Sequence, residues 1–217
     1  MHAAETDVVV PADEVELGAT LVVPADARGI VVFAHGSGSS RHSPRNRAVA
    51  AELHEDGLAT LLLDLLSLEE EAVDARTGEL RFDVRLLARR VAAATAWVGA
   101  EPKTAGLPVG YFGASTGAAA ALIAAAELPD QVHAVVSRGG RPDLAGESLA
   151  RVLAPTLLIV GGRDEVVIGL NEQALAELHV EKALEIVPGA THLFPEPGAL
   201  DEVIRLARAW FARHLAS

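Results

Sequence analysis

Short runs of apolar residues alternate with longer amphipathic segments along most of the chain. Residues 29–34 (GIVVFA) and 58–63 (LATLLL) are almost entirely apolar, which is typical of strands buried on both faces of a sheet. Residues 82–99 instead place their apolar side chains at the spacing of a helix. This alternation predicts an α/β fold, with a mostly parallel central sheet and helices on both of its faces.

The same pattern gives the order of the elements. We expect strands at residues 8–10, 15–23, 29–34, 58–63, 107–112, 132–137, 155–160 and 183–187. We expect helices at residues 44–56, 82–99, 116–128, 169–178 and 197–215. The first two strands should form an antiparallel hairpin at one edge of the sheet, because Pro11-Ala12-Asp13 separates them. Residues 66–80 are acidic and are expected to be an irregular surface excursion.

The interval between the strands at 132–137 and 155–160 is polar and short. It has room for one short helix at residues 143–153 and for no cap domain. The chain has 217 residues, of which 50% are hydrophobic and 22% charged, so it has the composition of a globular protein. No linker or repeat divides it, and we expect one domain over residues 1–217.

Charge and cysteine content exclude several classes of function. The formal net charge of −12 should repel nucleic acid and anionic membrane surfaces, so neither is an expected partner. With no cysteine there is no disulfide, no thiolate zinc site and no cysteine nucleophile. No H-E-x-x-H pattern occurs, and we expect neither a metal nor a cofactor. Residues 1–16 lack the apolar core of a secretory signal, which predicts a cytoplasmic protein.

Candidate functional residues directly follow the predicted strands. In a parallel sheet the carboxyl ends of the strands meet at one edge, and ligands bind there. The residues found by this rule are the segment 35–40, Asp64, the segment 113–117, the segment 138–140, Asp164 and His192. They include a serine, an aspartate and a histidine, which are the components of a nucleophilic triad.

Gly113-Ala114-Ser115-Thr116-Gly117 matches the G-x-S-x-G pattern. It lies between an apolar strand and an Ala-rich helix, which is the setting of a nucleophile elbow. In that turn the serine adopts strained backbone angles, and the flanking glycines allow close packing. We therefore predict that Ser115 is a nucleophile rather than a simple helix cap.

A serine hydroxyl needs a base to take its proton, and the base needs a carboxylate to orient it. His192 follows the last predicted strand and is the expected base, with His35 as the competing histidine. Asp164 follows the strand at 155–160 and is the expected acid, with Asp143 as the alternative.

The tetrahedral intermediate of acyl transfer requires two hydrogen-bond donors for its oxyanion. One should be the backbone N–H of Thr116, which follows the nucleophile. The other should be the N–H of Ser37, in the Gly/Ser-rich loop after residues 29–34. This loop lacks both the P-loop pattern and the third glycine of a dinucleotide fingerprint, which argues against a nucleotide site.

Three further residues are candidates for contact with substrate. Arg138 ends a buried strand and either grips an anionic substrate group or forms an internal salt bridge, for which Asp64 is a candidate partner. His35 presents the same choice between structure and binding. Phe194 is a candidate wall of the pocket in a chain that is only 4% aromatic.

Four segments together, GIVVFAHGSGSS, VGYFGASTG, LLIVGGRDEVV and EIVPGATHLF, resemble the α/β-hydrolase superfamily and more closely its dienelactone-hydrolase-like branch. The resemblance covers nearly the whole chain and implies a Ser115–His192–Asp164 triad with an oxyanion hole at Ser37 and Thr116. Relatives of that branch are sometimes fused to phosphoribosyltransferase domains. Dienelactone hydrolase proper uses a cysteine nucleophile, whereas this chain has Ser115, so its narrow lactone specificity does not carry over.

The expected function is a serine hydrolase that cleaves small carboxylic esters or lactones through an acyl-enzyme. Two alternatives remain at this point. One is other acyl chemistry on the same fold, as in a thioesterase, peptidase or acyltransferase. The other is an engineered or idle scaffold that carries the triad without using it. No pattern in the sequence specifies an oligomeric state.

Overall fold

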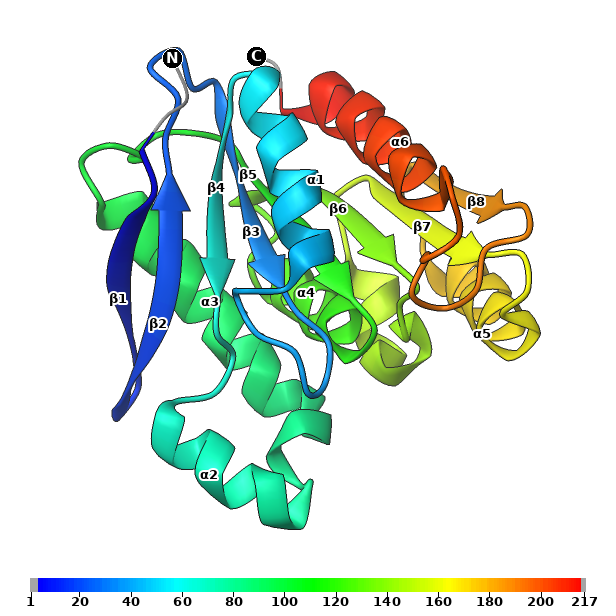
Figure 1. The fold of residues 1–217 in the computed structure, drawn as a ribbon, viewed down its shortest axis with the longest axis horizontal. Coiled ribbons are helices and arrows are strands. Elements are labelled where there is room, and N and C mark those ends of the chain that lie inside the picture. The colour runs from blue at the N-terminus through cyan, green and yellow to red at the C-terminus, as the bar shows by residue number, and fades with distance from the viewer. Residues whose placement is uncertain (1–3, 216–217) are drawn as a thin grey trace.

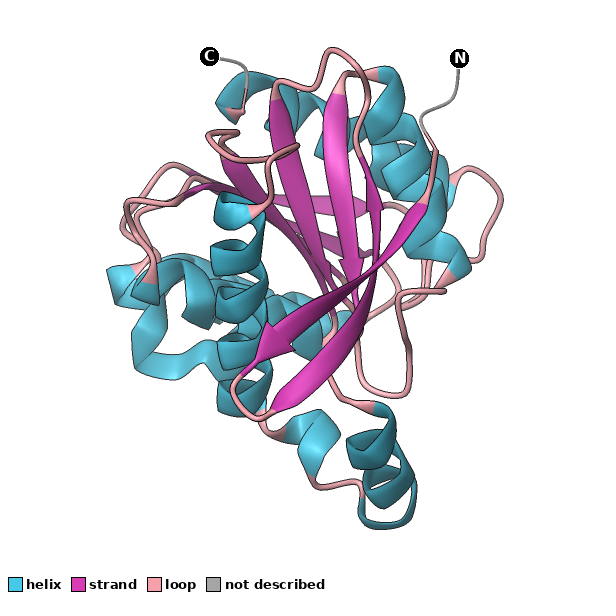
Figure 2. Cartoon of the chain, turned by 90° about the vertical axis from the view of Figure 1, so that its left-hand side faces the viewer, coloured by secondary structure: helices cyan, strands magenta, loops and turns pink. Residues whose placement is uncertain are grey.

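The computed structural model describes residues 4–215 of the chain. Its centre is an eight-stranded sheet in the order β1-β2-β4-β3-β5-β6-β7-β8 (Figure 1). The strands are β1 (Thr6–Ala12), β2 (Val15–Val22), β3 (Gly29–Ala34), β4 (Leu58–Leu63), β5 (Val109–Ala114), β6 (Val132–Arg138), β7 (Thr156–Gly161) and β8 (Lys182–Val187). Pairing is parallel from β4 to β8 and antiparallel at β1–β2 and β2–β4. The predicted parallel sheet and N-terminal hairpin are confirmed, and Figure 2 shows the twist between them.

Helices cover both faces of the sheet. They are α1 (Pro44–Glu55), α2 (Leu68–Thr77), α3 (Val84–Ala100), α4 (Thr116–Glu127), α5 (Glu165–Glu177) and α6 (Ala199–His214), with 3₁₀ segments η1 (Leu80–Phe82) and η2 (Pro142–Arg151). Helices α1 and α6 lie on one face, and α3, α4 and α5 lie on the other (Figure 1).

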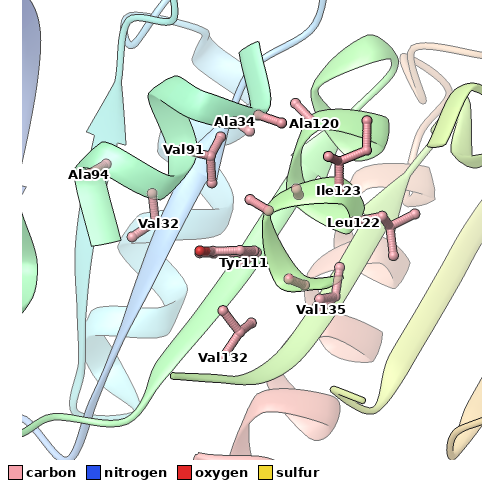
Figure 3. Packing of buried hydrophobic residues seen from close by; sticks show 14 of the residues in the cluster. Val32, Ala34, Val91, Ala94, Tyr111, Ala120, Leu122, Ile123, Val132 and Val135 are labelled. Carbon is pink, nitrogen blue, oxygen red and sulfur yellow. The ribbon is translucent and has the colours of Figure 1, made fainter. Parts of the chain in front are cut away.

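The two cores follow from the alternation of side chains along each strand. Val32 and Tyr111 point toward α3 and α4, whereas Phe33 and Phe112 point toward α1 and α6 and stack with ring centroids 4.9 Å apart. Figure 3 shows the first of these cores around Tyr111. The Tyr111 hydroxyl lies 2.6 Å from Thr95 Oγ1, so the one polar atom of this ring is paired. The small side chains of α4 let this helix pack closely against α3 and η2.

Three expectations about elements are wrong in detail. Residues 66–80 are not irregular, because they contain α2, which begins with a capping box between Ser67 and Glu70. Helix α5 begins at Glu165, not at residue 169. The short helix expected at 143–153 is the 3₁₀ segment η2, which is interrupted at Gly146 (φ 52°, ψ −133°).

The edge that carries the candidate site residues and the ends of the described chain lie on opposite sides of the molecule. The parallel strands end at the edge that carries α2 and the start of α4, whereas β1 begins and α6 ends at the other edge (Figure 1). There Leu215 packs against the first residue of β3, since a Cβ on Gly29 would lie 3.2 Å from Leu215 Cβ.

Candidate active site

Ser115 occupies a sharp turn between β5 and α4. Its backbone has φ 50° and ψ −123°, a conformation that L-residues rarely adopt. A Cβ on Gly113 would lie 2.4 Å from Ala118 Cα, and one on Gly117 would lie 2.2 Å from the carbonyl oxygen of Ala34. Both glycines are therefore needed for the helix to start this close to the sheet. The serine is held at the N-terminal end of α4, where the helix dipole favours negative charge.

His192 and Asp164 form a hydrogen-bonded pair at the same edge. His192 Nδ1 lies 2.7 Å from Asp164 Oδ2, and the two side chains are 40% and 17% exposed. The carboxylate accepts the Nδ1 proton, so Nε2 is the nitrogen left to act as a base. Asp143, the alternative acid, is instead bound by Arg141 through contacts of 2.9 and 2.8 Å.

One loop contacts both Ser115 and His192. Ser115 N–H donates to the carbonyl of Arg138 at 3.4 Å, and Arg141 N–H donates to the carbonyl of Ser115 at 3.0 Å. On its other side the loop packs against the histidine, because a Cβ on Gly139 would lie 3.6 Å from His192 Cε1. Within residues 4–215 no hydrogen bond joins the Ser115 hydroxyl to His192. In many enzymes this bond tightens only when substrate binds.

The two expected oxyanion donors are also adjacent. Ser37 N–H donates to the Thr116 hydroxyl at 3.0 Å across the 79 residues that separate them in sequence. Thr116 is the first residue of α4, so its own N–H has no acceptor within the helix. A Cβ on Gly36 would lie 2.9 Å from Ser115 Cβ, which shows how closely the Ser37 loop approaches the serine.

Sequence reasoning did not find the contacts that hold the histidine loop. Glu196 accepts hydrogen bonds from Thr191 N–H (3.1 Å) and from the Thr191 hydroxyl (2.6 Å). Phe194 has a positive φ of 55° and is only 2% exposed, so it anchors this loop in the core rather than facing a pocket. No sequence motif marks Glu196, since its role depends on how the loop turns back.

His35 connects two loops through both of its ring nitrogens. Nδ1 lies 2.9 Å from the carbonyl of Gly36, and Nε2 accepts the N–H of Leu65 at 3.1 Å. Burial lowers the pKa of His35, which outweighs the effects of the Gly36 carbonyl and of Asp64. The neutral ring therefore ties the Ser37 loop to the chain after β4.

Arg138 has no carboxylate partner among the described residues. It is 6% exposed, and its recorded side-chain contact is with Asn46 Oδ1 at 3.3 Å. Asp64 instead accepts the N–H of Arg41 at 2.7 Å and lies 3.5 Å from its guanidinium, so the suggested Arg138–Asp64 bridge is absent. Burial and the nearby Arg45 lower the pKa of Arg138 to about 10. As a substrate contact, Arg138 stays a prediction.

A cavity of about 480 Å³ lies between the loop after β3 and the α2–η1 excursion, and its lining residue Gly36 approaches Ser115. It is lined by His35, Gly36, Ser37, Gly38, Ser39, Ser40, His42, Ser43, Pro44, Leu65, Leu66, Glu71, Asp74, Arg81 and Leu87. Arg138 and Phe194 are not part of its lining.

Among residues 4–215 no cluster of three potential metal ligands occurs, and no helix is long and apolar enough to cross a membrane.

This arrangement of sheet, elbow and strand-end residues defines an α/β-hydrolase fold. Residues 17–212 match the dienelactone hydrolase family, and the chain belongs to that family. Its fold is that of the α/β-hydrolase superfamily, as the sequence resemblance predicted.

Comparison with individual proteins agrees with this assignment. The crystal structure of dienelactone hydrolase from Anabaena variabilis is similar with a TM-score of 0.97 and 59% identity, covering 99% of this chain and 100% of that one. Est1E from Butyrivibrio proteoclasticus shares the fold with a TM-score of 0.80 at 16% identity, covering 97% of this chain and 99% of that one.

A longer relative is a putative phosphoribosyl transferase of Mycobacterium tuberculosis. It is 59% identical over 211 residues, which cover 97% of this chain and 47% of the relative. The chain thus spans about half the length of the curated relatives that it matches most strongly.

Proposed function

We propose that this protein is a serine hydrolase that cleaves small carboxylic esters or lactones through an acyl-enzyme. The observation that carries the proposal is the strained Ser115 at the same sheet edge as an imidazole oriented by a carboxylate, with Nδ1 of His192 2.7 Å from Asp164. Such a set is built for acyl transfer, because it combines a nucleophile, a base and an orienting acid.

In the proposed first step, the Ser115 oxygen attacks the substrate carbonyl carbon while His192 Nε2 takes the hydroxyl proton. The carbonyl oxygen becomes an oxyanion and accepts hydrogen bonds from the N–H groups of Thr116 and Ser37. In the structure, Ser37 N–H donates to the Thr116 hydroxyl at 3.0 Å. The oxyanion would replace that hydroxyl as the acceptor.

The intermediate then collapses, and the bond to the leaving alkoxide breaks as that oxygen takes the proton from His192. Water next attacks the acyl-enzyme with His192 as base, and the acid and free Ser115 are released. In a lactone the leaving alkoxide stays tethered to the acyl group and departs only in this second step.

The names of the relatives support the hydrolase assignment to different degrees. The Anabaena protein is called a dienelactone hydrolase, which supports a lactone or ester as the substrate class. The mycobacterial relative has a transferase name but is about twice as long, and the residues of this chain that align with it are those that match the hydrolase family. We therefore do not assign phosphoribosyl transfer to this chain.

Substitution of Ser115 tests the proposal directly. Ser115→Ala should abolish both hydrolysis of p-nitrophenyl acetate and labelling by a fluorophosphonate probe, with the far-ultraviolet circular dichroism unchanged. Labelling that persists in the variant would overturn the assignment of the nucleophile. A wild-type protein that is neither labelled nor active would be an idle scaffold, and peptide and thioester substrates test the rival acyl chemistries.

Asp164 and Asp143 provide a matched pair of variants. Asp164→Asn should lower kcat by ~10⁴, the scale known for serine proteases, because the imidazole would adopt the wrong tautomer. Asp143→Asn should leave kcat within about tenfold, since Asp143 binds Arg141 and not the histidine. The reverse ranking would mean that the acid is misassigned.

A further inference from the structure

The cavity beside Ser115 has an apolar floor and a polar, acidic wall. Leu65, Leu66 and Leu87 supply the apolar side chains, and Glu71 of α2 lines the wall. Gly36 belongs both to the lining and to the contact with Ser115, so the cavity adjoins the serine through this loop, although Ser115 and His192 are not themselves among the lining residues. A volume of about 480 Å³ is in the range of small-molecule sites.

Two acidic side chains in this region, Asp74 and Asp64, are each paired with an arginine. Asp74 accepts hydrogen bonds from the N–H groups of Leu80 (2.8 Å) and Arg81 (3.0 Å) and pairs with the Arg81 guanidinium. Asp64 is paired with Arg41. These two pairs cancel in charge and hold the excursion and the loop after β3 in place.

Glu71 differs from both, because it forms no ion pair within residues 4–215 although it is only partly exposed. Partial burial raises its pKa, and the charges of Asp64 and Asp74 raise it further. The charged groups that act on Glu71 most strongly are therefore acidic. The cavity carries one uncompensated negative charge, placed on the wall opposite the Ser37 loop.

We propose that this cavity binds a cationic group of the substrate, with Glu71 as its counter-charge. The substrate class is then an ester with a positively charged amine on its acyl or alcohol part. A carboxylate-bearing ester would be disfavoured, because the unpaired Glu71 would repel it. The net charge of −12 acts in the same direction by attracting cations to the protein. This inference rests on the proposed function and adds the substrate charge to it.

Two pairs of esters of equal shape isolate the effect of charge. Acetylcholine and 3,3-dimethylbutyl acetate differ only by nitrogen or carbon in the alcohol part. The p-nitrophenyl esters of 4-(trimethylammonio)butanoic acid and 5,5-dimethylhexanoic acid differ in the same way in the acyl part. The measured quantity is the ratio of kcat/KM for the cationic ester to that for the neutral one.

The variants are Glu71→Gln and, as matched control, Glu79→Gln, which removes the same charge from an exposed residue outside the cavity. In at least one pair, Glu71→Gln should lower the cation preference about fivefold, the scale of a single partly screened ion pair. Glu79→Gln should keep the wild-type ratio to within about twofold.

An unchanged ratio in both pairs for Glu71→Gln overturns the proposal, and so does an equal loss in the control. Hydrolysis of the neutral esters and probe labelling of Ser115 are measured in every variant. If neutral-ester hydrolysis and probe labelling persist but Glu71→Gln leaves the kcat/KM ratio unchanged, the hydrolase function is retained and the proposed cation site is wrong. If they are absent in the wild type, the proposed function itself fails.

Discussion

Two bulky or polar residues with positive φ lie next to the proposed reaction centre, Ser115 at 50° and Phe194 at 55°. Strain of this kind persists only where the surroundings fix it, and it concentrates at functional sites. For Ser115 the fixing groups are backbone atoms of the neighbouring strand and helix, which leave no space for a Cβ at Gly113 or Gly117. The position of Ser115, the proposed nucleophile, is thus determined by residues that have no side chain.

Gly117→Ala tests this dependence. The new Cβ would lie 2.2 Å from the Ala34 oxygen and 2.4 Å from the His35 oxygen, so the end of β3 and the Ser37 loop must move. We expect a loss of about 2–3 kcal/mol in the free energy of unfolding, measured in urea, and a large loss of kcat. The control is Gly169→Ala in α5, where nothing lies within 4 Å, and it should stabilise the protein by about 0.5–1 kcal/mol.

Arg138 and Arg90 are both buried arginines, yet we expect opposite results from replacing them. Arg90 is bonded to Glu70 at 2.8 Å and to the Ala12 carbonyl, so Arg90→Met should cost about 3–5 kcal/mol. Arg138 has no carboxylate partner among the described residues, so Arg138→Met should leave the free energy of unfolding unchanged or raise it. Equal destabilisation in urea would contradict this difference. A raised KM for carboxylate-bearing esters in Arg138→Met would support Arg138 as a substrate contact and would count against the cationic substrate proposed for the cavity.

At the scale of elements, α2 depends on its first turn. The Ser67 hydroxyl accepts the N–H of Glu70 at 3.2 Å, and the Glu70 carboxylate accepts the N–H of Ser67 at 2.9 Å. Ser67→Ala should therefore destabilise the helix by about 1 kcal/mol and increase hydrogen exchange in residues 68–77. Thr77→Ala, at the exposed last residue of the helix, is the control and should change neither the stability of α2 nor the hydrogen exchange in residues 68–77.

The α2–η1 excursion should also lose stability at acidic pH, because protonation of Asp74 weakens its interactions with Arg81. Burial alone would raise the pKa of Asp74, but hydrogen bonds from Arg81 and Leu80 outweigh it and hold the pKa below 3.8. A carboxyl with a lowered pKa in the folded state stabilises fully above its unfolded pKa and less as the pH falls below it. The stability difference between wild type and Asp74→Asn should accordingly shrink between pH 5 and pH 3 in urea titrations. A constant difference would argue against an ionised Asp74 in the folded state.

The buried strands could be predicted closely because burial on both faces leaves an unbroken apolar run, as in β3 and β4. The acidic helix α2 was missed because its exposed carboxylates obscure the helical pattern, although the S-x-x-E capping signal was present. The strand-end rule led to Ser115, Asp164 and His192, since topology alone places such residues at one edge. The pairs Thr191–Glu196 and Arg41–Asp64 could not be predicted, because they depend on loop conformations.

For the whole molecule, the short interval between β6 and β7 holds only η2, which does not line the cavity, and the α2–η1 excursion that does line it contributes Glu71, Asp74 and Arg81, so a long acyl chain would find little apolar cover. Each methylene beyond it should gain far less than the ~0.8 kcal/mol of full burial. We expect kcat/KM for p-nitrophenyl esters to be flat or to fall beyond short acyl chains, with no jump above the solubility limit. An optimum at decanoate would show that an apolar surface covers the chain.

Both ends of the described chain lie at the edge of the sheet where the parallel strands begin, away from the start of α4 that follows Ser115 (Figure 1). Leu215 packs at the first residue of β3, and Thr6 pairs with Leu21, whose partner in β4 is Leu61. A polypeptide joined to either end would leave the molecule on the side remote from the reaction. The proposed hydrolase is in this sense a module that can be tethered, immobilised or carried beside another enzyme from either end, because both attachment points lie opposite the edge that carries the candidate active site.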